Sequence, residues 1–312
     1  MTAQRVLVVG GTGLIGAHAA LLLSERGDSV AVASRSGVKD NPQLAAFEHL
    51  RGDYTAGTFT ESDLASFDSI VFAAGNDVRH VAVTDESDRF WSSVQSDGVP
   101  NFVATAKRAG VGRVVQVGSC YHQFDPSFAG GSPYVESRRL ADERSRALSD
   151  GGFAVITLNP PPIVGSIPGR VQRRFGRMVQ WVRGQMPEVP VFAPRGGTNY
   201  MSARSLAQAI GGALTAGEPG RAYLVGDENL SYAEYFGMLA EVAGRTDPLE
   251  VRDEEHPFQP DRFIVQGRGN TMSYEPEPVE VERLGYDRGD IRRALTEIVT
   301  AIDADASTNR RG

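Results

Sequence analysis

The feature that most restricts the fold is a glycine-rich turn between a strand-like and a helix-like stretch near the start of the chain. In VLVVGGTGLIGAHAALLL, Gly10, Gly13 and Gly16 follow a β-branched run and precede an apolar helical pattern. The spacing G-x-x-G-x-x-G allows a tight turn, and the next helix offers amide donors to a pyrophosphate. The strand before and the helix after are what a dinucleotide-binding motif requires. A glycine turn without a ligand is the alternative interpretation.

The same alternation continues through the first half of the chain. Short apolar runs predict strands, and longer patterned stretches predict helices. Their order indicates an α/β fold with a doubly wound parallel sheet and helices on both faces. The predicted strands are Arg5–Val9, Ser29–Ala33, Ile70–Ala73, Arg113–Val117 and Phe153–Leu158, and the predicted helices are Leu14–Arg26, Val99–Ala109 and Tyr134–Ser149.

The pattern changes after LNPPPIVG, residues 158–165, because three consecutive prolines stop regular structure. We therefore expect a dinucleotide-binding domain over residues 1–165 and a smaller substrate-binding lobe over 166–302, partly interleaved with the first. Residues 303–312 read as a polar, frayed tail. Further helices are expected at Val171–Arg183, Ala203–Thr215, Tyr232–Ala243 and Asp290–Ile302, and a short strand at RAYLVG.

Composition excludes several classes of protein. The net charge of −7 argues against a nucleic-acid-binding protein, which usually carries a basic face. The single cysteine, Cys120, excludes an internal disulfide and a four-cysteine zinc site, and we expect no metal site. The first apolar run is too short for a signal peptide, and no run is long enough to span a membrane. We therefore expect a cytoplasmic protein with a small-molecule substrate.

The end of the second strand bears on the choice of cofactor. An acidic residue there binds the ribose hydroxyls of NAD, but this chain has Ser34, Arg35 and Ser36. A guanidinium beside two hydroxyls suits a 2′-phosphate, so we expect NADP more than NAD. Alternatively, Arg35 stacks on the adenine or lies in solvent. Asp53, after the third strand, is placed to accept from the adenine amino group, or else serves a turn.

In SPYVESRRLADE, Tyr134 and Arg138 are four residues apart and share one face of a predicted helix. A tyrosine beside a fixed positive charge can act as an acid or base on a hydroxyl or carbonyl. It can equally be an ordinary surface pair.

Together these stretches resemble the extended short-chain dehydrogenase/reductases, the group of NAD-dependent epimerases/dehydratases, dihydroflavonol reductases and hydroxysteroid dehydrogenases. VGGTGLIG, GDY, VFAAG and AKRAGVGRVVQVGS resemble the successive strand ends of that family's Rossmann domain. PYVESRRLADE resembles its Tyr-x-x-Ser-Lys-x-x-Ala-Glu helix, and LNPPPIVG its Arg-Pro-x-x-Val-Tyr-Gly turn. YMSARSLAQAI and YLVGDENLSYAEYFGMLAEVAG resemble its C-terminal lobe.

The resemblance implies roles for particular residues. Tyr134 exchanges a proton with the substrate oxygen, Ser119 holds that oxygen, and position 138 assists the tyrosine and contacts the nicotinamide ribose. The cofactor contacts are expected from Gly10, Thr12, Gly13, Leu14, Ile15, Gly16, Arg35, Asp53, Tyr54, Ala73, Ala74, Gly75, Pro160 and Ile163. A homodimer through the helices Val99–Ala109 and Tyr134–Ser149 is also implied.

The chain departs from the family at position 138, where arginine replaces lysine. Arg138 keeps the charge and can donate to ribose hydroxyls, but it cannot release a proton near neutral pH and its fork is bulkier. A shift of one residue in the match would put Cys120 in the place of Ser119. We prefer Ser119, because a thiol is a poor donor. A Cys120–His122 nucleophilic pair lacks an orienting third group.

Other polar residues are candidates for the same cleft. Asn76, Asp77, Arg79 and His80 follow the fourth strand and read equally as a solvated loop. His122 follows the fifth strand, and for it a surface-loop position is slightly favoured over the substrate pocket. The C-terminal lobe carries arginines suited to a substrate diphosphate, or simply to a solvated face, with Met186 and Phe192 as an apolar wall. These arginines are Arg170, Arg173, Arg174, Arg177 and Arg183.

Three functions are consistent with the sequence. The first is an NADP-dependent oxidoreductase that transfers hydride to or from a carbonyl or secondary alcohol, with Tyr134 as acid/base. The second is a nucleotide-sugar epimerase or dehydratase, against which Arg35 counts because NAD is usual in that chemistry. The third is a non-catalytic NADP-binding redox sensor, which Arg138 favours and Tyr134 and Ser119 oppose.

Overall fold

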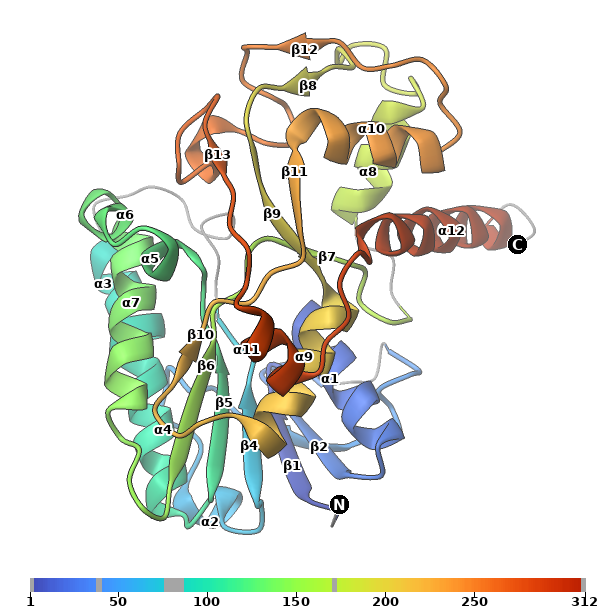
Figure 1. Cartoon of the computed structure of the whole chain (residues 1–312). Coiled ribbons are helices and arrows are strands. Elements are labelled where there is room, and N and C mark those ends of the chain that lie inside the picture. Colours follow the sequence, from blue (N-terminus) through green and yellow to red (C-terminus); the bar gives the residue numbers. More distant parts are fainter. Residues whose placement is uncertain (1–2, 38–40, 76–86, 170–172, 310–312) are drawn as a thin grey trace. The chain divides into compact units, whose positions relative to one another are not determined.

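The computed structural model describes residues 3–37, 41–75, 87–169 and 173–309 (Figure 1). The chain divides into two compact units. The first comprises Met1–Pro160, Leu206–Val225 and Pro276–Tyr286, and the second comprises Pro161–Ser205, Gly226–Glu275 and Asp287–Gly312.

A parallel sheet forms the centre of the first unit. In the described part of the chain it has seven strands in the order β10-β6-β5-β4-β1-β2-β3. Its strands are short and rich in Val, Ile and Ala, as expected for strands covered on both faces. They are β1 Arg5–Val9, β2 Ser29–Ser34, β3 Glu48–Arg51, β4 Ser69–Phe72, β5 Arg113–Val117, β6 Ala154–Leu158 and β10 Ala222–Tyr223. The predicted doubly wound α/β fold is confirmed.

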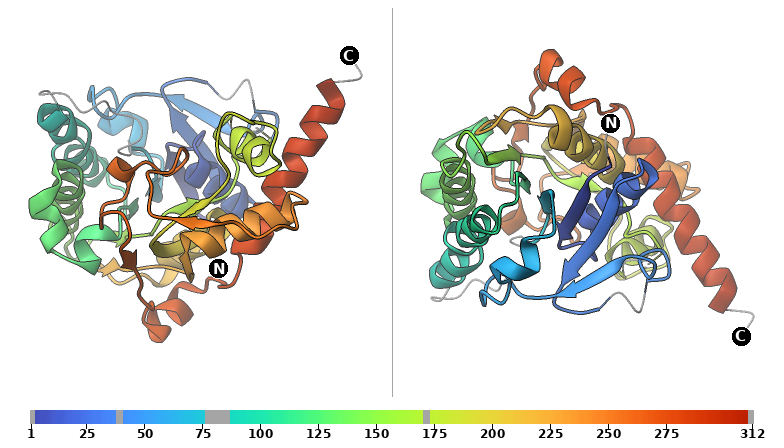
Figure 2. Two further views of the ribbon diagram at one scale, coloured as in Figure 1. Left: turned by 90° about the horizontal axis from the view of Figure 1, so that it is seen from above. Right: turned by 90° about the horizontal axis from the view of Figure 1, so that it is seen from below.

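Helices cover both faces of this sheet. Figures 1 and 2 show α4 (Gly98–Arg108) and α7 (Pro133–Arg146) on one face, with α1 (Leu14–Glu25) and α9 (Ala203–Ala216) on the other. Apolar side chains of α4 pack on the strands in a core that includes Phe102 and Ile70. The shorter helical segments are α2 Glu61–Leu64, α3 Ser87–Trp91, the π-helical turn Ser92–Ser96, α5 Tyr121–Phe124, α6 Ser127–Gly131 and α11 Pro278–Leu284.

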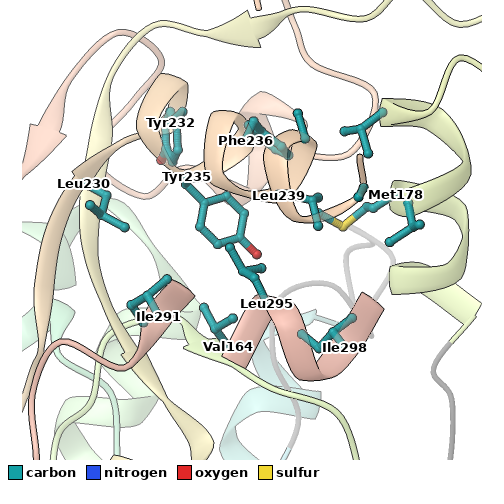
Figure 3. Close-up of a cluster of buried hydrophobic side chains, with 14 of the residues drawn as sticks. Val164, Met178, Leu230, Tyr232, Tyr235, Phe236, Leu239, Ile291, Leu295 and Ile298 are labelled. Carbon is teal, nitrogen blue, oxygen red and sulfur yellow. The ribbon is translucent and has the colours of Figure 1, made fainter. Parts of the chain in front are cut away.

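The second unit has its own core. Aromatic and aliphatic side chains of α10 face those of α8 and α12, as Figure 3 shows for Leu239, Met178 and Leu295. Around them, β9 pairs with β7, β11 and β13, and β12 pairs with β8. The elements are β7 Ile163–Val164, α8 Arg173–Val182, β8 Ala193–Pro194, β9 Gly197–Ser202, β11 Glu228–Ser231, α10 Tyr232–Val242, β12 Val251–Arg252, the 3-10 turn Asp261–Phe263, β13 Thr271–Met272 and α12 Ile291–Asn309.

The prediction of a frayed tail from residue 303 is wrong for the residues described. Helix α12 continues to Asn309. Asp303 forms an ion pair of 2.7 Å with Arg183 of the same unit, and alanines at positions 304 and 306 favour helix. The polar composition reflects a solvated helix and not an unfolded end. No helix in the described ranges combines the length and the hydropathy needed to cross a membrane.

A buried histidine is part of the second unit's core. The ring of His256 lies 4.5 Å from that of Phe236 and 4.9 Å from that of Trp181, between centroids. Its Nε2 lies 3.1 Å from the carbonyl oxygen of Phe192, and its Nδ1 accepts from the Phe258 amide at 3.2 Å. Both contacts suit the neutral ring with its proton on Nε2. Burial lowers the pKa of His256 from 6.5 to about 4, although the bond to Phe192 opposes this.

We expect stability to fall as the pH drops from about 6.5 to 4, because the unfolded chain takes up a proton that buried His256 excludes. Above that range the residue is neutral in both states and its contribution is complete. His256→Gln should flatten this part of a plot of unfolding midpoint against pH. His49→Gln, at a partly exposed histidine, is the matched control. An unchanged slope in His256→Gln would contradict the assignment.

Candidate active site

The loop between β1 and α1 is packed so tightly that only glycine fits at two positions. Gly10 has φ +81°, and a Cβ there would lie 2.7 Å from the Ala74 nitrogen and 2.8 Å from the Ala73 carbonyl carbon. A Cβ at Gly16 would overlap the carbonyl oxygen of Gly10. Gly13 donates to that same oxygen at 2.9 Å. The loop therefore lies directly against the end of β4.

This geometry leaves the N-terminus of α1 open. Gly13 is its N-cap and has no side chain with which to cap the first turn. Leu14 and Ile15 begin the helix, and Thr12 precedes the cap; all three are partly buried. The unsatisfied amides of a first turn attract a phosphate through hydrogen bonds and the helix dipole. The glycine cradle thus fits a dinucleotide pyrophosphate.

The ends of β2 and β3 meet beside this loop. Arg35 is exposed after β2, and the Ser34 hydroxyl lies 2.8 Å from Nε2 of His49 in β3. Asp53 accepts from the Thr55 amide at 2.9 Å and from its hydroxyl at 2.7 Å, so the turn interpretation describes its present contacts. Burial would raise the pKa of Asp53, but the Thr55 hydrogen bonds and the charge of Arg35 lower it.

Arg138 reaches the end of β4. A Cβ added at Gly75 would lie 3.5 and 3.6 Å from its terminal nitrogens and 3.0 Å from Nε2 of Gln95. The edge between β1 and β4 is where the strand order of the sheet reverses, and ligands of such sheets bind there. The guanidinium therefore lies at the position expected for a bound cofactor.

Two tyrosines lie near Arg138 and differ in their surroundings. The Tyr54 hydroxyl donates to the Val94 carbonyl at 2.8 Å, and burial raises the pKa of Tyr54 to about 12, although the charge of Arg138 opposes this. The Tyr134 ring centroid lies 5.6 Å from the guanidinium carbon of Arg138. Arg138 thus lies near both tyrosines, and the Tyr54 hydroxyl is bonded to the backbone.

Local sequence explains the position of Tyr134. Ser132 caps α7 by accepting from the Val135 amide at 3.4 Å, and Pro133 occupies the first turn, where its missing amide is tolerated. The Tyr134 ring packs against Trp91 with centroids 5.1 Å apart and against Tyr121 at 6.5 Å. Ser119, two residues before Tyr121, is buried in the loop after β5. The structure thus brings this loop and the first turn of α7 together.

The Ser119 and Cys120 alternatives differ little in burial, since both side chains are buried. The Cys120 amide donates to the Pro160 carbonyl at 3.0 Å. Pro160 therefore supports the loop of the first unit. Ile163 begins β7 in the second unit.

The sequence did not single out three buried polar contacts behind Ser119. Asn159 accepts from the Ser119 amide at 3.0 Å, and its own amide lies 3.3 Å from Asp142. Nε2 of His122 lies 3.0 Å from Asp142. The surface-loop interpretation of His122 is therefore wrong. Asp142 lies two turns after Tyr134 on α7, a spacing that could have signalled a shared face. In the match of LNPPPIVG to the Arg-Pro-x-x-Val-Tyr-Gly motif, Asn159 occupies the position of the arginine.

The remaining predicted candidates either belong to the second unit or fall outside the described residues. Asn76, Asp77, Arg79, His80 and Arg170 fall outside the described residues. In the second unit, Arg174 donates to the Phe258 carbonyl at 3.1 Å, Arg177 lies over the Phe258 ring, and Arg183 pairs with Asp303. Arg173 is exposed.

The two residues expected to form an apolar wall, Met186 and Phe192, both belong to the second unit. Phe192 is buried in the second unit, and Met186 is partly buried and packs on that unit's core. Phe192 is therefore part of the structure of that unit.

The sequence matches a known family over most of its length. The model of the NAD dependent epimerase/dehydratase family matches residues 6–226. A 3-beta-hydroxysteroid dehydrogenase of Mycolicibacterium neoaurum is 34% identical over 119 residues, which are 37% of this chain and 32% of the relative. The match thus spans about a third of that relative's length.

Solved structures with the same fold cover nearly the whole chain. A UDP-N-acetylglucosamine 4-epimerase from Bacillus cereus aligns with a TM-score of 0.70 at 15% identity, over 96% of each chain. The Bordetella bronchiseptica enzyme WbmH in complex with NAD+ aligns with a TM-score of 0.71 at 18% identity, over 97% of this chain and 99% of its own. At such identities the likeness establishes the fold alone.

We expect Gly16→Ala to weaken dinucleotide binding by about tenfold or more, because the added methyl group displaces the loop whose amides face the phosphates. Calorimetric titration with the nicotinamide cofactors measures this. Gly151→Ala is the control, since a Cβ there meets nothing within 4 Å. Equal affinity in Gly16→Ala and the unchanged protein would rule out the loop as the phosphate site.

Proposed function

Because the chain belongs to the NAD-dependent epimerase/dehydratase family, we propose that it is an NADP-dependent oxidoreductase acting on a carbonyl or secondary alcohol. The family match confirms the resemblance to extended short-chain dehydrogenases/reductases, whose members are enzymes with a nicotinamide cofactor. The observation that carries the proposal is the pairing of Tyr134 with Arg138 at the end of β4.

The assigned roles follow from the contacts. A bound nicotinamide would supply or accept the hydride. Tyr134 moves a proton between its hydroxyl and the substrate oxygen, and Arg138, beside the Tyr134 ring, offers hydrogen-bond donors to the cofactor ribose. Ser119 holds the substrate oxygen with its hydroxyl. The acid/base role is not assigned to Tyr54, because its hydroxyl already donates to the Val94 carbonyl.

The preference for NADP rests on the end of β2. Arg35 is exposed there, between Ser34 and Ser36. Its guanidinium can bind a 2′-phosphate, and none of these three residues carries a carboxylate that would repel the phosphate. Structural relatives solved with NAD argue for the other cofactor. The relative affinities for NADP and NAD therefore decide between the two cofactors.

We expect Arg35→Ala to weaken NADP binding by about tenfold or more while leaving NAD binding nearly unchanged, because only NADP carries the phosphate that the guanidinium would bind. Calorimetric titration of both cofactors measures the difference. Arg51→Ala, at an exposed arginine that ends β3, is the control. Equal weakening of NADP and NAD would remove the phosphate assignment.

We expect Tyr134→Phe to lower turnover by about 10²-fold or more, as loss of a general acid/base does. Arg138→Ala should also lower turnover, whereas Arg138→Lys should keep or raise it. The assay is a panel of ketones and aldehydes followed by loss of reduced-nicotinamide absorbance. Arg139→Ala is the control, since Arg139 pairs with Glu136 and Glu143 on the exposed side of α7. An unchanged rate in Arg138→Ala would exclude Arg138 from the mechanism.

A second candidate is nucleotide-sugar epimerisation. Its support is that several structural relatives are nucleotide-sugar epimerases, with NAD in two of the solved complexes. Such an enzyme returns its cofactor unchanged after each turnover. A product epimerised without net loss of reduced nicotinamide would therefore favour it over the oxidoreductase.

A further inference from the structure

A cluster of buried polar side chains lies behind the loop that carries Ser119. Asn159 follows β6, Asp142 is on α7, and His122 is in α5; their exposed fractions are 0%, 1% and 8%. All belong to the first unit. Their hydrogen bonds run to one another and to the backbone of Ser119, which points to a structural reason for their burial.

Asn159 holds the loop where the sheet ends. The Gly118 amide donates to the Leu158 carbonyl at 2.8 Å, and the Cys120 amide donates to the Pro160 carbonyl at 3.0 Å. Between these two backbone bonds, the Ser119 amide donates at 3.0 Å to Oδ1 of Asn159. A Cβ at Gly118 would overlap that oxygen, so glycine permits the approach. The side chain of Asn159 thus satisfies the one amide that lies between the two backbone bonds, and it fixes the backbone of Ser119.

Asp142 determines how the Asn159 amide is turned. An ionised carboxylate only accepts hydrogen bonds, so Asn159 must present its NH2 group to it. Nδ2 of Asn159 lies 3.3 Å from Oδ2 of Asp142 and 2.8 Å from the Gln123 side-chain oxygen. Its Oδ1 consequently points to the Ser119 amide.

The charge on Asp142 is maintained by its neighbours. Burial would raise the pKa of Asp142, but hydrogen bonds from His122 and Arg146 and the charge of Arg146 lower it to about 2. Nε of Arg146 lies 2.5 Å from Oδ1, and Nε2 of His122 lies 3.0 Å from Oδ2. The carboxylate therefore stays ionised throughout the range in which the enzyme would work.

We infer that Asn159, oriented by the Asp142 carboxylate, is a positioning residue that sets the place of Ser119 for the reaction. The inference rests on the proposed function, because Ser119 has its role only there. The chain of contacts runs from Arg146 and His122 through Asp142 and Asn159 to the Ser119 amide. A displacement of the order of 1 Å at a substrate-holding group can cost about 10²-fold in rate.

The first test needs no substrate. Hydrogen exchange at the Ser119 amide, followed by NMR in the unliganded full chain, should accelerate in Asn159→Ala and also in Asp142→Asn, whose amide no longer dictates the orientation of Asn159. Ser145→Ala is the control, because Ser145 is buried on α7 and its hydroxyl has no hydrogen-bond partner among the described residues. Unchanged Ser119 protection in Asn159→Ala, or in Asp142→Asn if Asn159→Ala does not fold, would overturn the inference. This result is independent of whether the proposed activity exists.

The second test uses turnover. Asn159→Ala should lower kcat by about 10- to 10²-fold while the calorimetric affinity for the cofactor stays the same. In a Ser119→Ala background, the same change should have no further effect on kcat, since Asn159 acts through Ser119. An equal fall in kcat in both backgrounds would show a general structural role and contradict the inference. Absence of turnover in the unchanged protein would contradict the proposed function, and the exchange result would then decide the positioning alone.

Discussion

The candidate site depends on the contact between the loop after β1 and the end of β4. Gly10 lies so close to Ala73 and Ala74 that a side chain at Gly10 would collide with their backbone, and Gly16 allows the helix to start against the same loop. This contact opens the first turn of α1 to a phosphate. It also places Gly75, which follows on β4, beside the guanidinium of Arg138.

Arg138 has a different meaning once its surroundings are known. In sequence it is a departure from lysine that makes activity less certain. In the structure its guanidinium lies near the ends of β4 and α7, within reach of the Tyr134 ring and of Gly75. The structure thus keeps a positive charge beside Gly75 and the Tyr134 ring. Under the proposed function, only proton release through that side chain is lost.

Much of the fold was readable from local pattern, because buried parallel strands and amphipathic helices have strong sequence periods. The strands Arg5–Val9 and Arg113–Val117 were predicted with their observed limits. The sequence did not predict the end of α12. This part of the helix has an ion pair between Asp303 and Arg183, which lies 120 residues away in sequence and so leaves no local pattern. Short strands of the second unit, such as Gly197–Ser202, carry no apolar alternation and pair with distant segments.

The buried contacts behind Ser119 were not predictable for the same reason. Asn159 lies 40 residues from Ser119 and 17 from Asp142 in sequence, so their proximity comes only from the pairing of β5 with β6 and the packing of α7. From the sequence His122 looks like a solvated loop residue, and only the packing against α7 shows that it is buried in α5. The pair Tyr134 and Arg138 was predictable, because one helix brings them together.

The most direct test of the whole account follows the hydride itself. Reduced NADP deuterated at the transferable position of the nicotinamide would be incubated in stoichiometric amount with the protein and a panel of ketones and aldehydes, with products read by mass spectrometry. The account predicts one deuterium in an alcohol product for each NADP formed. Recovery of the labelled cofactor unchanged, with no deuterium in any product, would contradict it.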